Sequence, residues 1–291
     1  MAFKIPTTGT SVPDSPDKLF RELPRRKFPD VLPHQAQMMQ AYAAKAVNAE
    51  DVALQLPTGS GKTLVGLLIA EWRRRKYRER VIYLCPTKQL VYQVAEEAEK
   101  KYGLSVSTFV GSKRDFTPAS KTDYLQAQKI AVTTYSALFN TNPFFNQADI
   151  IFVDDAHASE NYIAHLWTLR VNRLEGRYAG LHQALCNAFA PYLTATDLSR
   201  LSGVWEDVVD RNWVEKIATP TVVKLTPQII EILDAHTQDT DLAYSWSLIR
   251  SHLDACHVYL SSQEIMIRPL LPPTFSHPAF GHAKQRIYMS A

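Results

Sequence analysis

A glycine-rich loop between an apolar strand and a helix constrains the fold of this chain more than any other feature. Leu54–Thr63 reads LQLPTGSGKT. Glycines within such a turn let successive backbone N–H groups surround an anion, and the helix that follows adds the positive end of its dipole. The lysine is placed to reach terminal phosphates, and the hydroxyl after it can bind Mg²⁺. The predicted nucleotide-binding residues of this loop are Thr58, Gly59, Ser60, Gly61, Lys62 and Thr63.

One position departs from the generic phosphate-loop pattern. That pattern has glycine at the position of Leu56. The strand–loop–helix context still favours a phosphate site over a chance glycine-rich turn.

The loop opens a regular alternation of strands and helices. Apolar segments at 51–57, 80–86, 104–111, 129–135 and 148–155 are typical of buried strands, and 62–76 and 87–103 are typical of helices. A further helix is expected over 33–47. Apolar strands that alternate with helices predict an α/β fold whose mostly parallel sheet is covered by helices on both faces.

A pair of carboxylates follows the last of these strands. Ile150–His157 reads IIFVDDAH. Because parallel sheets bind ligands beyond the carboxyl ends of their strands, Asp154 is placed to share a Mg²⁺ ion with Thr63, and Asp155 to position a water molecule.

Together, PTGSGKT and DDAH resemble the first RecA-like motor domain of a superfamily 2 helicase of the DEAD/DEAH-box kind. The resemblance implies ATP and Mg²⁺ as cofactors, with Lys62, Asp154, Asp155 and His157 in the catalytic set. LPHQAQ is similar to the family's glutamine motif, which implies that Gln35 contacts adenine.

Further segments resemble the family's nucleic-acid motifs in the expected order. CPTKQLVYQ, VGSKRDF and VTTYSAL would contact a nucleic-acid backbone. The residues implied by this resemblance are Pro86, Thr87, Gln93, Gly111, Ser112, Thr134 and Tyr135. The partner implied is nucleic acid, with DNA favoured over RNA.

The chain departs from the family pattern in two places. The family usually has glutamate where Asp155 stands, so water positioning is expected to change. The family also reaches its Ser-Ala-Thr motif soon after the acidic pair, whereas here MSA appears only at 289–291. Ser290 is then expected to couple nucleotide state to nucleic-acid binding. The chain would end inside that motif, without the second RecA-like domain, and would bind ATP with little turnover.

These features predict three regions. Residues 1–30 form an irregular lead-in; 31–157 and 283–291 form the motor domain; and 158–282 form a mainly helical insertion. In the insertion, 161–174 is expected to be helical, a helix is expected to begin at Thr226 and Pro227, and 257–269 is expected to form a hairpin. The insertion is either an accessory module that separates nucleic-acid strands or binds a partner, or a cap that stabilises the motor core. Its tryptophans (Trp167, Trp205, Trp213 and Trp246) are expected in the core rather than against bases.

Composition sets further bounds. No apolar stretch is long enough for a membrane span, and three dispersed cysteines indicate reduced thiols and a cytoplasmic setting. The basic run Arg73–Arg80 is interpreted as a solvated helix end rather than a nucleic-acid patch. Three other functions stay open: a restriction or antiviral-defence translocase that does not unwind, a nucleotide-gated nucleic-acid-binding module, and a phosphate-loop kinase.

Overall fold

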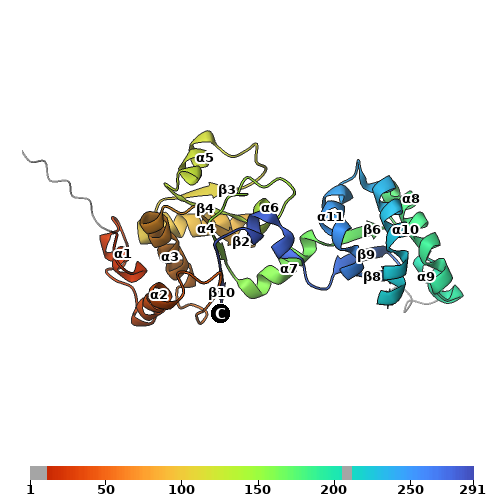
Figure 1. Ribbon diagram of the computed structural model, residues 1–291, viewed down its shortest axis with the longest axis horizontal. Coiled ribbons are helices and arrows are strands. Elements are labelled where there is room, and N and C mark those ends of the chain that lie inside the picture. Colours follow the sequence, from red (N-terminus) through yellow and green to blue (C-terminus); the bar gives the residue numbers. More distant parts are fainter. Residues whose placement is uncertain (1–11, 205–211) are drawn as a thin grey trace, which may run out of the picture. The chain divides into compact units, whose positions relative to one another are not determined.

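The computed structural model describes residues 12–204 and 212–291 (Figure 1). The chain divides into two compact units. The first runs through Glu160 and resumes at Phe275–Ala291, and the second comprises Asn161–Thr274. The start of the predicted lead-in (1–11) and Trp205 lie outside the described residues.

The first unit is built on a parallel sheet. Within the described residues it has six strands in the order β1-β10-β5-β2-β4-β3, and every neighbouring pair is parallel. Their bounds are β1 Asp51–Gln55, β2 Val81–Cys85, β3 Val106–Phe109, β4 Ile130–Thr134, β5 Ile150–Val153 and β10 Gln285–Ser290. The predicted fold class is confirmed.

The last strand in the sequence lies inside this sheet. β10 pairs with β1 on one side, with Leu54 opposite Met289, and with β5 on the other, with Val153 opposite Tyr288. The second unit is therefore inserted between two neighbouring strands. Because all strands run the same way, Ser290 ends beside the phosphate loop and the acidic pair.

Helices cover the sheet on both faces. They are α1 Pro16–Glu22, α2 Pro33–Lys45, α3 Lys62–Tyr77, α4 Lys88–Glu97, α5 Pro118–Leu125, α6 Tyr135–Leu138, the start of α7 Ala156–Leu166, and α12 Pro278–Gly281; a π-helical segment, Ala98–Tyr102, continues α4. The presence of α1 corrects the prediction that the whole lead-in is irregular. Leu19 and Phe20 of α1 are buried in the core cluster, which explains why this segment is ordered.

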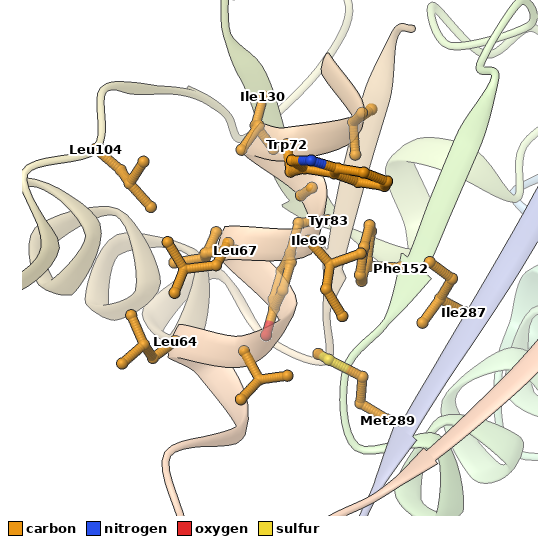
Figure 2. Packing of buried hydrophobic residues seen from close by; sticks show 14 of the residues in the cluster. Leu64, Leu67, Ile69, Trp72, Tyr83, Leu104, Ile130, Phe152, Ile287 and Met289 are labelled. Carbon is orange, nitrogen blue, oxygen red and sulfur yellow. The ribbon is translucent and has the colours of Figure 1, made fainter. Parts of the chain in front are cut away.

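Helix α3 is almost wholly buried against the sheet. Figure 2 shows its residues Leu64, Leu67 and Trp72 in the same cluster as Tyr83 and Met289 from the strands. The helix that follows the phosphate loop is thus fixed by apolar packing, which keeps Lys62 and Thr63 in a defined place.

The second unit has a sheet of its own. Its described strands are β6 Leu169–Asn172, β7 Val214–Lys216, β8 Cys256–Ser261 and β9 Glu264–Pro269, antiparallel in the order β6-β9-β8-β7. Its helices are the end of α7, α8 Ala179–Phe189, α9 Ala195–Leu201, α10 Thr219–Thr237 and α11 Leu242–Ile249. The predicted hairpin is confirmed as β8 and β9.

Two predictions for this unit are wrong. The expected helix over 161–174 stops at Leu166, because Leu169 and Val171 alternate into the core as strand β6. Helix α10 begins at Thr219, not at Thr226, and Pro227 lies inside it. Val222 and Leu225 continue the buried face that Ile229 and Leu233 complete, so packing outweighs the missing proline N–H. Trp167 and Trp246 are buried, as predicted, whereas Trp213 is only half-buried.

Candidate functional site

The glycine loop has the backbone geometry of an anion cradle. Gly59 and Gly61 have φ of 77° and 81°, and Gly61 caps the N-terminus of α3. The Ser60 N–H closes a turn by donating to the Pro57 carbonyl at 3.1 Å. A Cβ at Gly61 would lie 2.4 Å from Gln35 Nε2, whereas nothing lies within 4 Å of one at Gly59. The left-handed backbone therefore favours glycine at both positions, and a side chain at 61 would also displace the end of the Gln35 side chain.

Hydrogen bonds from α2 and from β10 hold the loop in place. Gln35 Nε2 donates to the Ser60 carbonyl at 2.7 Å, while Gln35 Oε1 accepts from the Leu32 N–H at 2.9 Å. The Leu56 N–H donates to the Ser290 carbonyl at 3.0 Å. The Leu56 side chain is buried in the core cluster, which explains the departure from glycine at this position.

A hollow of about 730 Å³ opens beside the loop. Residues 55–60 line one side of it, and His34, Gln37, Met38 and Ala41 from α2 are among those that line the other. Gln35 lies behind the loop, with its amide bonded to the backbone. Its predicted contact with adenine therefore stays a prediction.

The acidic pair follows β5 at the same edge of the sheet. Burial raises the pKa of Asp154, and the Tyr83 hydroxyl and the Lys62 ammonium oppose that shift. Burial also raises the pKa of Tyr83; Asp154 raises it further, and the Thr63 hydroxyl lowers it. Tyr83 thus lies near both Thr63 and Asp154, the two predicted magnesium ligands.

Tyr83 is a site residue that the sequence did not reveal. It lies in the middle of the buried segment VIYLC, where a tyrosine is indistinguishable from core. Among the described residues its Oη has no hydrogen-bond partner, and neither does the buried Oγ of Ser60. Only the order of the strands, with β2 next to β5, brings this hydroxyl to the acidic pair.

Asp155 and His157 lie on the exposed side of the same edge. Asp155 has a left-handed backbone, with φ of 52°, and its N–H donates to Asp154 Oδ1 at 3.1 Å. His157 Nδ1 forms a hydrogen bond with Ser290 Oγ. The structure therefore brings together the phosphate loop, both carboxylates, His157 and Ser290.

These groups fit a nucleotide with Mg²⁺. The loop offers phosphate oxygens its backbone N–H groups, the Lys62 charge and a Ser60 hydroxyl that no described residue binds. Oxygen atoms of Thr63 and Asp154 are the hard ligands that Mg²⁺ prefers.

The predicted nucleic-acid contacts have mixed placements. Gln93, Gly111 and Ser112 are exposed, and Pro86 and Thr134 are half-buried. Thr87 caps α4 by accepting from the Leu90 N–H. A second hollow, of about 270 Å³, is lined by residues that include Gly111, Ser112, Lys113, Ser136 and Asn140.

For Tyr135 the predicted contact with nucleic acid is corrected. Its side chain is buried, and its hydroxyl donates to the Asp154 carbonyl. A tyrosine ring buried in this way cannot contact a nucleic-acid strand. Instead, Tyr135 supports the backbone of the acidic pair from the neighbouring part of the sheet.

The interpretation of Arg73–Arg80 also changes. Arg73 is buried rather than solvated and pairs with Glu79 at 2.6 Å, while Arg74 and Arg75 both pair with Glu71. Much of the positive charge of this run is neutralised within the chain.

Comparisons with known proteins place the chain in a family. Residues 33–196 match the DEAD/DEAH box helicase family, a match that covers more than half of the chain. The chain therefore belongs to the DEAD/DEAH box helicases. None of the curated protein sequences gives a significant match.

Several solved structures are similar to the chain. A structure titled XPD_APO has 18% sequence identity over 88% of this chain and 52% of its own, with a TM-score of 0.49. The S. tokodaii Xpd4 structure has 13% identity over 88% and 56%, also with a TM-score of 0.49. The UvsW helicase from Bacteriophage T4 has 20% identity over 51% and 52%, with a TM-score of 0.39. The chain thus spans about half the length of each.

Among the residues that the structure describes, no helix combines the length and hydropathy of a membrane span. The same residues contain no group of three or more His, Cys, Asp or Glu side chains arranged to hold a metal ion.

Proposed function

We propose that this chain is the ATP-binding motor unit of a helicase or translocase that couples ATP hydrolysis to movement along a nucleic-acid strand. Family membership supports ATP use and nucleic-acid binding in general terms. The observation that carries the proposal is that the loop after β1, with Lys62 and Thr63, and the acidic pair after β5 lie at the same edge of the parallel sheet, on either side of β10.

The proposed roles follow from the donor atoms. Lys62 and the N–H groups of residues 59–61 would hold phosphates, and Thr63 and Asp154 would hold Mg²⁺. When bound, the ion would neutralise charge that develops on the phosphate oxygens. Asp155, exposed beside Asp154, would orient a water molecule, and His157 would connect the site to Ser290.

Nucleotide binding tests the proposal directly. Titration with a fluorescent ATP analogue should give saturable binding that weakens when EDTA removes Mg²⁺. Lys62→Ala should weaken binding by at least tenfold, because it removes the charge nearest the phosphates. Lys100→Ala is a matched control, since Lys100 is an exposed lysine that pairs with Glu96 one helical turn away. Equal affinities for the two variants would rule out the assigned site.

We propose further that this chain alone turns ATP over slowly. In the family's mechanism, the second RecA-like domain supplies groups for hydrolysis, and the chain spans about half the length of the helicase structures named above. Phosphate release should stay near background with or without single-stranded DNA. Robust DNA-stimulated release would contradict this. If a full-length protein also bound ATP without release, the nucleotide-gated binding module would be the better description.

A further inference from the structure

The four-stranded sheet of the second unit has two unlike faces. In β8 and β9 every second residue is fully buried, including Val258, Leu260, Ile265 and Ile267. Helices α8, α10 and α11 contact the strands of this sheet. The residues between the buried ones point the other way and are half-exposed. Among the described residues, the sheet therefore has one face in the core and one whose side chains are partly exposed.

Cross-strand pairing gathers particular side chains on the open face. Arg170 lies opposite Met266, Met266 opposite Tyr259, and Tyr259 opposite Lys216, which makes one row across all four strands. In the adjacent row, His257 lies opposite Arg268. We call these residues the cationic face: Arg170, Lys216, His257, Tyr259, Met266 and Arg268.

This face carries two cations, Lys216 and Arg268, that have no ion-pair partner among the described residues, whereas Arg170 pairs with Glu264. Burial lowers the pKa of His257, and the charges of Lys216 and Arg268 lower it further, so both cations lie near its ring. The centre of the face is thus positively charged, although the second half of the sequence has more acidic than basic residues.

Two rings lie among these cations. His257 Nδ1 is 3.2 Å from the Tyr259 hydroxyl, and the ring centroids are 6.1 Å apart at 73°. Both rings are half-exposed on a sheet surface with few acidic groups. Flat surfaces that combine aromatic rings with nearby cations bind single strands, because bases stack on the rings while cations contact the phosphates.

We propose that the cationic face binds single-stranded nucleic acid, with Tyr259 and His257 contacting bases and Lys216 and Arg268 contacting phosphates. The residues of this site differ from those of the ATP site and from the predicted nucleic-acid contacts of the motor unit. An acidic protein segment would satisfy the cations but would leave the rings without stacking partners, which is why a nucleic-acid strand is the better occupant.

Fluorescence anisotropy of the whole chain tests this site. Labelled 20-nucleotide oligo-dT and oligo-rU are titrated without ATP at about 50 mM salt, where phosphate contacts are strong. Lys216→Glu and Arg268→Gln should each weaken binding about fivefold or more. Each should also make the slope of log affinity against log salt concentration less steep by about 0.7, the value for one phosphate contact to a single strand. Tyr259→Leu preserves charge and apolar area and should cost about tenfold through lost stacking.

The matched control is Lys224→Glu. Lys224 lies on α10 of the same unit beside Tyr192, so this substitution makes the same charge change away from the cationic face. It should change affinity less than twofold. Thermal melting should show that all variants are folded.

Several results would overturn the site. One is an equal loss of oligonucleotide affinity in Lys216→Glu and Lys224→Glu. Another is wild-type affinity in Tyr259→Leu. A third is a labelled poly-glutamate peptide that binds as tightly as oligo-dT and depends on Tyr259 to the same extent. Binding of either oligonucleotide with the expected sensitivity supports it. The variants should still bind the ATP analogue. A wild-type chain that fails to bind ATP would count against the proposed function without affecting these comparisons.

Discussion

Ser290 connects the two halves of the nucleotide site through two different atoms. Its Oγ forms a hydrogen bond with His157 Nδ1, and its carbonyl accepts the Leu56 N–H at the start of the phosphate loop. His157 and Ser290 are 133 residues apart in sequence. His157 and Ser290 are therefore separated in sequence by the insertion, but the position of β10 in the sheet brings them into contact.

A double-mutant cycle should detect the contact between His157 and Ser290. We expect His157→Ala and Ser290→Ala to show a coupling of about 0.5–1 kcal/mol in the free energy of unfolding, the range for a partly exposed hydrogen bond. Urea unfolding of the wild type, both single variants and the double variant gives this value. Strictly additive effects would mean that the contact does not form in solution.

The backbone of Asp155 predicts an unusual substitution pattern. With φ of 52° this residue is left-handed, a conformation that aspartate tolerates better than glutamate and that glycine adopts freely. Asp155→Glu should destabilise the chain by about 0.5–1 kcal/mol, whereas Asp155→Gly should be neutral or stabilising. Urea unfolding checks both.

The two substitutions at Asp155 should rank differently in ATP turnover than in stability. In a full-length protein, Asp155→Glu should retain or raise ATP turnover because it restores the family's residue, and Asp155→Gly should abolish it. Loss of turnover in Asp155→Glu would show that the shorter side chain is required here.

Removing the Tyr83 hydroxyl should separate stability from magnesium binding. Because Tyr83 Oη is buried without a hydrogen bond to any described residue, Tyr83→Phe should leave the free energy of unfolding unchanged or raise it by about 1 kcal/mol. The same hydroxyl lies near Thr63 and Asp154, so the variant should need a higher Mg²⁺ concentration for half-maximal binding of the ATP analogue. Tyr124→Phe is the control, since its hydroxyl is likewise buried without a partner. The same Mg²⁺ dependence in both variants would contradict a role for Tyr83.

Asp149 should make the free energy of unfolding depend on pH in the acidic range. Burial disfavours its charged form, but hydrogen bonds from Arg80 and Lys284 outweigh burial and lower its pKa below the usual value of about 4. A lowered pKa means that its stabilisation is complete above that value and is lost as pH falls through the folded-state pKa. Asp149→Asn should therefore cost about 1–2 kcal/mol at pH 7 and less near pH 3. Urea unfolding at both pH values measures this, and an equal cost at both would refute the assignment.

Local sequence predicted the parts of the site that depend on local chemistry. The glycine spacing at 59 and 61 specifies the turn, and an apolar run followed by two aspartates specifies a buried strand with carboxylates at its end. Strand β10 was recognisable from its apolar pattern. Regular alternation was enough for the α/β class because burial on both faces leaves strands uniformly apolar.

Other outcomes depended on contacts between distant segments. Leu169–Asn172 is a strand because β9 pairs with it, and Arg73 can be buried because it forms an ion pair with Glu79. Tyr135 was predicted to contact nucleic acid, but the Asp154 carbonyl draws its hydroxyl inward.

The sequence by itself determined that this protein has a phosphate loop, an acidic pair and a parallel sheet, since each follows from residue type and short-range spacing. Only the tertiary structure decided that Tyr83 lies beside Thr63 and Asp154, that Ser290 joins His157 to the loop, and that Lys216, Tyr259 and Arg268 share one open sheet face. The physical reason is that strand order and register are set by burial summed over the whole core, so no local segment contains them.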